Sequence, residues 1–124
     1  KEPQRKMTDK RLLGAFGEQR AALFLRENGY RILSANFRCE GGEIDVIAEK
    51  DGIICFVEVK TRTEGAMLPP SSAVGVHKMK NITSAADVYM GKYGLKNDVR
   101  FDIVEVITDK NGALLSVNHI KNAF

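Results

Sequence analysis

Two acidic residues and a lysine dominate the chemistry that this sequence offers: Asp45 in GEIDV, and Glu58 and Lys60 in FVEVK. Carboxylate oxygens are the ligands that Mg²⁺ prefers, and Mg²⁺ takes one or two of them while keeping water and substrate phosphate in its other positions. Such a cation polarises a phosphoryl oxygen, and a neighbouring ammonium group stabilises the charge that develops. Brought together by the fold, these residue types favour hydrolysis of a phosphodiester.

Two predicted strands must position these residues. Residues 43–49 alternate apolar and polar side chains, and residues 53–60 are rich in β-branched and aromatic residues, so we expect both segments to be strands. Between them, Asp51-Gly52 is typical of a hairpin turn. The second strand is apolar on both faces over its inner part, which predicts a central place in the sheet.

The turn decides which residues face each other across this hairpin. A two-residue or four-residue loop places Asp45 opposite Glu58 and Glu43 opposite Lys60, whereas a three-residue loop or a bulge would not. Opposed residues point to the same side of a sheet, and their Cβ atoms lie about 4.5–5.5 Å apart. We therefore expect all four side chains on one face of the hairpin.

Two carboxylates as close as Asp45 and Glu58 repel each other. A shared proton, a bridge from Lys60 or a bound divalent cation would offset that repulsion, and a cation makes both residues metal ligands. A structural explanation stays open. Glu43 and Lys60 would then form an ordinary cross-strand ion pair, Asp45 would bind backbone amides, and Glu58 would lie at a solvated strand end.

A helix is predicted over about residues 9–28, with Thr8 or Asp9 as its N-cap and Gly29 at its end. Glu18 lies in the middle of a stripe of small and apolar residues at helical spacing. The stripe consists of Gly14, Ala21, Ala22 and Leu25. Small residues indicate close packing against another element, so Glu18 is a candidate to reach the site as a further metal ligand or water holder.

The remaining elements complete a small mixed sheet. They are an extended piece at 31–37, a helical region from Ser71 or Ser72 to about Lys92, a strand at 100–107 and an edge strand at 113–120. A strand that follows a helical crossover normally runs parallel to its neighbour. The expected fold class is α/β, a mixed sheet with helices on its faces.

Length and composition narrow the class of protein. The chain has 124 residues, 44% of them hydrophobic, which suits one domain at 12–124 after a flexible basic arm at 1–11. The net charge of +3 permits a polyanion partner. Cys39 and Cys55 complete no zinc pattern, and no apolar run is long enough to span a membrane. We expect a cytoplasmic protein with no membrane association and no small-molecule cofactor.

Three basic residues are candidates for binding nucleic acid. Arg62 follows the EVK segment and offers a planar group that suits two phosphate oxygens, while Lys78 and Lys80 open the second predicted helix. A solvated strand end or helix face is the alternative explanation for each of them.

Longer segments carry the pattern beyond the hairpin. GEIDVIAEKDGIICFVEVKTR, FGEQRAALFLRENGYRIL, RFDIVEV and HIKNAF together resemble the YraN-like family of uncharacterised bacterial proteins, over about residues 12–124. That family is similar to the PD-(D/E)xK nucleases and the archaeal Holliday junction resolvases. The resemblance implies a restriction-endonuclease-like fold with an α-β-β-β-α-β core.

The resemblance also implies roles for individual residues. Asp45 and Glu58 match the metal-binding carboxylates, and Lys60 matches the catalytic lysine. Glu18 matches an acidic residue that resolvase-like members carry on a helix, and Glu43 belongs to the G-E-I-D signature, where we expect it to support Lys60 or the metal shell. The loop EGAMLPPSSAV departs from the family pattern, which bears on substrate contacts rather than on the metal site.

The expected function is hydrolysis of phosphodiester bonds in DNA by an endonuclease that uses Mg²⁺ or Mn²⁺. The resolvase-like relatives imply a branched or junction substrate, and symmetric cutting of two strands would suit a homodimer. One alternative is a non-catalytic nucleic-acid-binding protein with a nuclease-like fold. The other is an interaction protein in which the carboxylates and the lysine form a closed ion-pair cluster.

Overall fold

The computed structural model describes residues 10–65 and 75–124. Within these ranges, two helices and five strands follow one another in the predicted order, including the last edge strand. They are α1 (Lys10–Glu27), β1 (Arg31–Cys39), β2 (Gly42–Lys50), β3 (Ile53–Thr63), α2 (Val76–Lys92), β4 (Val99–Thr108) and β5 (Leu114–Ile120). The N-cap predicted at Thr8 or Asp9, most of the basic arm, and the second helix start predicted at Ser71 or Ser72 lie outside the described residues.

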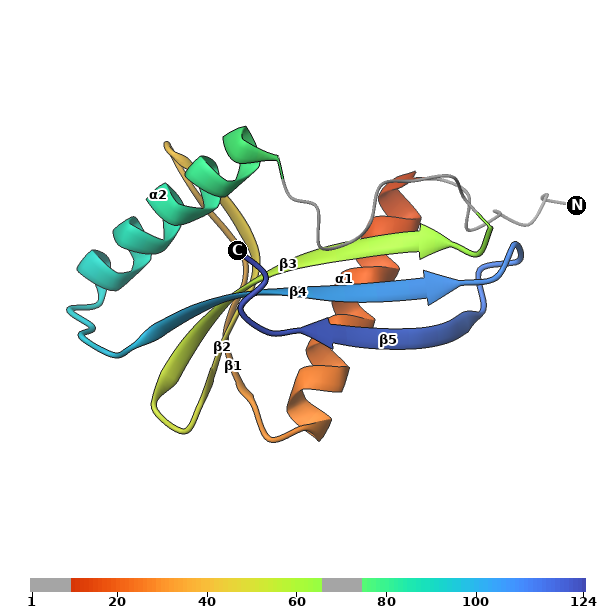
Figure 1. Cartoon of the computed structure of the whole chain (residues 1–124), viewed down its shortest axis with the longest axis horizontal. Helices are drawn as coiled ribbons and strands as arrows, with labels where there is room; N and C mark the ends of the chain where they lie inside the picture. The colour runs from red at the N-terminus through yellow and green to blue at the C-terminus, as the bar shows by residue number, and fades with distance from the viewer. Residues whose placement is uncertain (1–9, 66–74) are drawn as a thin grey trace, which may run out of the picture.

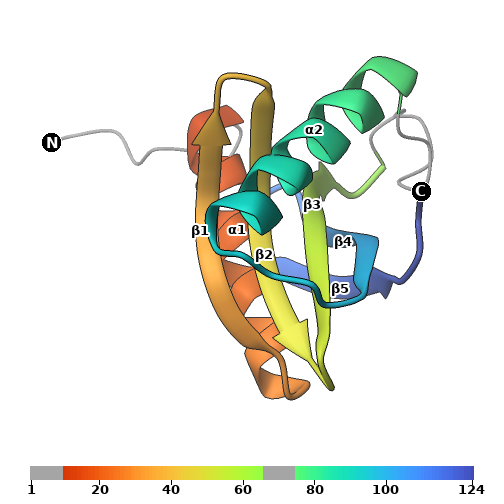
Figure 2. The same ribbon diagram turned by 90° about the vertical axis from the view of Figure 1, so that its left-hand side faces the viewer.

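The strands form one mixed sheet in the order β1-β2-β3-β4-β5. The crossover through α2 makes β3 and β4 parallel, as predicted, and the other neighbouring pairs are antiparallel. Figures 1 and 2 show α1 and α2 on opposite faces of the sheet. This is the α-β-β-β-α-β core of the restriction-endonuclease-like fold, with β5 added at one edge.

Each helix covers its own apolar cluster, and β3 contributes to both. Cys55 and Val57 pack in the cluster under α1, while Ile54 and Phe56 pack in the cluster under α2. These four residues are at most 1% exposed. The prediction that this strand is central and covered on both sides is confirmed, and Cys55 is a buried core residue.

The hairpin turn between β2 and β3 has the predicted geometry. Asp51 and Gly52 both have positive φ angles, 53° and 79°, which is the left-handed pair that a type I′ turn requires. The turn pairs Lys50 with Ile53, and the register then runs without a shift to the pair Val46 and Val57. The predicted register is therefore confirmed over these residues.

Helix α1 approaches the sheet most closely at Gly17, not within the predicted stripe at Gly14. A Cβ atom at Gly17 would lie 1.8 Å from Thr61 Oγ1 and 3.0 Å from Thr61 Cβ, whereas a Cβ at Gly14 would meet nothing within 4 Å. The prediction of close packing was right, but it was assigned to the wrong glycine. This contact holds the helix that carries Glu18 against the strand that carries Glu58.

We expect Gly17→Ala to lower the free energy of unfolding by about 1–3 kcal/mol, because Thr61 must move to admit the methyl group. Gly14→Ala is the matched control. It adds the same methyl group to the same helix in open space, and it should raise the free energy of unfolding by up to about 1 kcal/mol through helix propensity. Urea denaturation of both variants measures the two changes, and equal effects would contradict the close contact.

Candidate metal centre where two strands separate

The sheet divides at one end of the β2–β3 hairpin. Pairing between the two strands ends at Val46 and Val57, after which β2 continues alongside β1, and β3 continues alongside β4. Figure 1 shows the β1–β2 hairpin rising away from β3, β4 and β5 beyond this point. We call the place where β2 and β3 separate, next to Asp45 and Glu58, the fork.

Asp45 lies where β2 changes the direction of its side chains. Ile44 packs in the cluster under α2, but Val46, two residues later, packs in the cluster under α1. The neighbouring strand is irregular at the same level, since Asn36 has a φ angle of 55°. Asp45 Oδ2 accepts a hydrogen bond of 2.8 Å from Val59 N of β3. A side chain therefore takes the place of the backbone pairing at the fork.

This irregularity overturns the prediction that four side chains share one face. Asp45 lines a cavity on the α1 side together with Glu18, whereas Glu58 contacts Lys78 of α2. Glu43 pairs with Arg38, with 3.4 Å between its Oε2 and the arginine Nε. The prediction assumed regular alternation along β2, which fails between Ile44 and Val46.

Asp45 and Glu58 nevertheless meet at the fork, where their carboxyl groups share a hydrogen bond. Burial, the hydrogen bond with Glu58 and the charge of Glu58 together raise the pKa of Asp45 to about 8, against the amide of Val59, which lowers it. The charge of Glu18 adds to the same effect. At neutral pH the pair therefore holds a proton, which is one of the three means of offsetting repulsion expected from the sequence.

Lys78 supplies a positive charge to this pair. Its Nζ lies 3.0 Å from Glu58 Oε2, and the Glu58 side chain is only 9% exposed. Burial by itself lowers the pKa of Lys78, but the hydrogen bond and charge of Glu58, with the charges of Asp45 and Glu43, raise it above its usual value. Sequence reasoning assigned Lys78 to phosphate binding and missed this contact, because no local spacing relates the start of α2 to the middle of β3.

The other predicted site residues lie around the fork with different partners. Lys60 is half-buried on β3, level with Glu105 of β4. Arg62 pairs with Glu105 at 3.5 Å, so its guanidinium faces a carboxylate where a phosphate was predicted. Lys80 is exposed on α2. Among the described residues, no three acidic, histidine or cysteine side chains converge on one point, so the predicted role of Glu18 as a third ligand stays a prediction.

The proton on Asp45 makes stability depend on pH in a definite direction. A carboxyl whose pKa is about 8 when folded and about 4 when unfolded stabilises the fold fully below pH 4, and the contribution is lost as pH rises to 8. Asp45→Asn should remove this slope and raise the free energy of unfolding at pH 8 by about 1–3 kcal/mol. Urea denaturation at pH 5 and pH 8 measures it. A closed ion-pair cluster would instead make the variant less stable at pH 8.

A second buried charged cluster lies away from the fork. Asp102 of β4 is fully buried and accepts hydrogen bonds from Arg100 Nε at 2.9 Å and from Asn122 N at 3.1 Å. His119 Nε2 of β5 lies 2.7 Å from Asp102 Oδ2, and Arg100 also donates to the Tyr30 hydroxyl at 2.7 Å. These contacts join β4, β5, the C-terminal turn and the connection between α1 and β1, which indicates a structural role for the cluster.

Comparison with known proteins settles the family. The model of the uncharacterised protein family UPF0102 matches residues 17–106, which include the fork, all of α2 and the part of α1 from Gly17 onward. The chain belongs to the UPF0102 family. The YraN-like resemblance read from the sequence is thereby confirmed.

Several UPF0102 relatives match nearly the whole chain. A UPF0102 protein of Caldanaerobacter subterraneus subsp. tengcongensis is 46% identical, with 96% of this chain and 99% of the relative covered. Those of Caldicellulosiruptor saccharolyticus and Acetivibrio thermocellus are 43% and 44% identical, each covering 94% of this chain and 99% and 93% of the relative. Their names carry the family alone, so the function of the UPF0102 chain has to be argued from its site. Neither described helix is long and apolar enough to cross a membrane.

Proposed function

We propose that this UPF0102 chain is a metal-dependent endonuclease that hydrolyses phosphodiester bonds in DNA. The observation that carries the proposal is the carboxyl pair of Asp45 and Glu58 at the fork, with Lys60 two residues along the same strand. Glu58 is buried and Asp45 is half-buried, so this pair of acids lowers the stability of the fold unless it holds a proton or a cation. Such a pair is well suited to binding a divalent cation next to a phosphate.

The residues present fit Mg²⁺ or Mn²⁺. The donors are carboxylate oxygens, and a cationic side chain, Lys78, already contacts Glu58 and lies within electrostatic range of Asp45. Mg²⁺ needs only one or two protein carboxylates, so two ligands are sufficient for it. When bound, the cation would supply Lewis-acid activation of a phosphoryl oxygen and of a water molecule.

The chain's own residues would divide the remaining work. Asp45 and Glu58 hold the cation at the fork. Lys60 stabilises the charge that develops on the phosphate or orients the attacking water. Glu18 approaches Asp45 from the α1 side and is positioned to hold a water molecule. Glu43, paired with Arg38, sits at the edge of the site and adjusts its charge.

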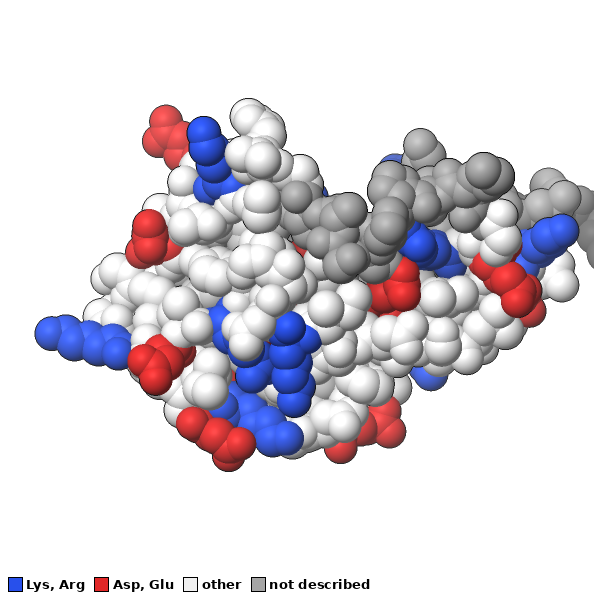
Figure 3. Space-filling model, in the orientation of Figure 1, with Lys and Arg blue, Asp and Glu red and all other residues white. Residues whose placement is uncertain are grey.

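DNA, rather than a small phosphoester, is favoured by the basic side chain of Lys78 on α2, which is half exposed and lies next to the carboxyl pair. Figure 3 shows that basic side chains on the face drawn there stand in separate groups with acidic ones beside them. Contacts local to the fork are therefore expected to hold the substrate. A branched or junction substrate and a homodimer are part of the proposal, and both rest on the resemblance to resolvases.

The test is cleavage of labelled linear, flapped and four-way-junction DNA with Mg²⁺ or Mn²⁺, comparing wild type with Asp45→Asn. Metal-dependent cutting by the wild type that the substitution abolishes is the expected result. Binding to these DNAs without cutting under any condition would favour the non-catalytic nucleic-acid-binding protein. If the protein neither bound nor cut any of these DNAs, the proposal would be overturned.

A further inference from the structure

Lys78 occupies the position of a bound cation. It belongs to the first turn of α2, and its ammonium lies 3.0 Å from Glu58 Oε2. The acidic side chains of Asp45 and Glu43 are near enough to act on it as well. One ammonium thus lies within the field of three acidic side chains that come from two strands, β2 and β3.

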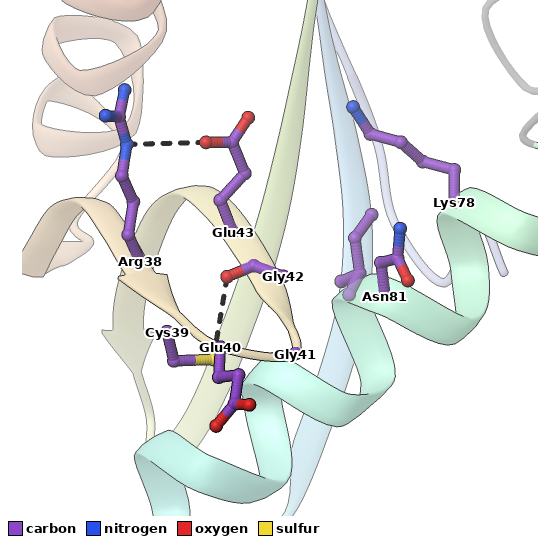
Figure 4. Close-up of a pocket in the computed structure, with 9 residues that line it drawn as sticks. Arg38, Cys39, Glu40, Gly41, Gly42, Glu43, Lys78 and Asn81 are labelled. Carbon is purple, nitrogen blue, oxygen red and sulfur yellow. Dashed lines mark hydrogen bonds and ion pairs between the residues drawn. The ribbon is translucent and has the colours of Figure 1, made fainter.

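The same lysine also lines a cavity next to the fork. This cavity, of about 470 Å³, lies between the turn that joins β1 to β2 and the first half of α2. Arg38, Lys78 and Asn81 line it, and Glu40 and Glu43 line it as well, so the cavity offers a ligand two cationic side chains and an amide beside two carboxylates. Figure 4 shows Lys78 extending from α2 toward the strands, with Arg38 and Glu43 on the other side.

A divalent cation and the Lys78 ammonium cannot both stay next to Glu58, because two positive charges within about 4 Å repel each other strongly when partly shielded from water. The lysine is the partner that can leave. Its side chain is 50% exposed, and its four-carbon stem is flexible, whereas Glu58 is fixed on the central strand. The adjoining cavity is within reach of the displaced ammonium, since Lys78 already lines it.

We propose that Lys78 is an exchangeable counter-ion of the metal site. Its ammonium neutralises Glu58 in the metal-free protein, is displaced by the divalent cation, and then binds a phosphate of the nucleic acid in the cavity beside Arg38. This rests on the proposed metal site at Asp45 and Glu58. It predicts that removing the lysine changes the affinities for metal and for nucleic acid in opposite directions.

The first measurement is calorimetric titration of Mn²⁺ and Mg²⁺ into wild type, Lys78→Met and Lys80→Met, without nucleic acid. Methionine keeps the length and apolar stem of lysine without its charge. Lys78→Met should bind metal about tenfold more tightly than wild type, because the competing ammonium is gone. Lys80→Met, which removes an exposed charge from the same helix, should stay within about twofold.

The second measurement is the affinity of the same variants for a labelled DNA duplex with Ca²⁺ in place of Mg²⁺. Lys78→Met should bind DNA about fivefold more weakly, through the loss of one phosphate contact. Arg38→Gln should also bind DNA more weakly without gaining metal affinity. A purely structural role for Lys78 would weaken the binding of both ligands, so opposite signs distinguish the two explanations.

The results of the metal titration distinguish a failure of the counter-ion role of Lys78 from a failure of the proposed metal site. Metal binding by wild type that Lys78→Met leaves unchanged or weakens would overturn the counter-ion role and leave the metal site standing. Failure of both wild type and Lys78→Met to bind metal would overturn the metal site and the inference together. Metal binding by Lys78→Met but not by wild type would support the exchange directly.

Discussion

Lys60→Ala is expected to lower metal-dependent cleavage of DNA by about 10²–10³-fold, which is the usual effect of removing one group that stabilises transition-state charge. The lysine is half-buried on the central strand, two residues from Glu58, so no solvent cation takes its place easily. Its loss should leave metal affinity within about threefold, because the carboxylates that bind the cation remain. The rate of cleavage at saturating metal, together with calorimetric metal binding, measures the two effects separately.

Two control variants test whether the loss of cleavage is specific to Lys60. Lys92→Ala removes an exposed lysine from the far end of α2 and should retain cleavage within about threefold. Asp45→Asn should lose both cleavage and metal binding, since it removes a ligand. If Lys60→Ala cleaved within tenfold of wild type, the lysine would have no catalytic role. If Asp45→Asn also retained the cleavage, the activity would come from a contaminating nuclease.

The hairpin shows what the sequence can predict. A turn dipeptide and a two-residue period are local signals, and they were sufficient to predict the register from the turn to Val46 and Val57 and to bring Asp45 near Glu58. The same reasoning failed one residue beyond the paired region. It assumed that Ile44 and Val46 face the same side, whereas the strand changes direction at Asp45. That change depends on the neighbouring strand, which no short-range pattern in β2 records.

Contacts between distant elements account for the other errors. Lys78 and Glu58 are twenty residues apart and meet only because α2 crosses over the fork. Gly17 and Gly14 look alike in a helical stripe, and only the position of Thr61 on β3 distinguishes them. Sequence periodicity therefore fixes which elements form and which face is apolar, while the partners of charged side chains depend on how the elements are placed relative to one another.

Asp45 is half-buried and Asp102 is fully buried, but their surroundings shift the pKa values of the two acids in opposite directions. Asp45 meets a second carboxyl and one backbone amide, and its pKa is raised to about 8. Burial also acts to raise the pKa of Asp102, but hydrogen bonds from His119, Arg100 and Asn122 outweigh it and lower the pKa. The charge of Asp102 is already stabilised by hydrogen bonds within the protein, so a bound cation would add little. Asp45 faces a second carboxyl, so a bound cation would stabilise its charged form. This contrast supports the fork, rather than the Asp102 cluster, as the metal centre.

Asp102→Asn is expected to lower the free energy of unfolding at pH 7 by about 3–5 kcal/mol, because it leaves Arg100 buried without its charged partner. The exposed neighbour Asp98 supplies the matched control, and Asp98→Asn should stay within about 0.5 kcal/mol. Urea denaturation measures both variants.

The pH dependence of the free energy of unfolding is a second test of the role of Asp102. Because the pKa of Asp102 is lowered in the folded protein, its contribution is present above about pH 4 and is lost as pH falls through the folded pKa. The difference between wild type and Asp102→Asn should therefore shrink at pH 3, whereas the difference between wild type and Asp45→Asn changes between pH 5 and pH 8. A deficit in Asp102→Asn that stayed constant from pH 7 to pH 3 would mean that shape, rather than charge, makes Asp102 necessary for the fold.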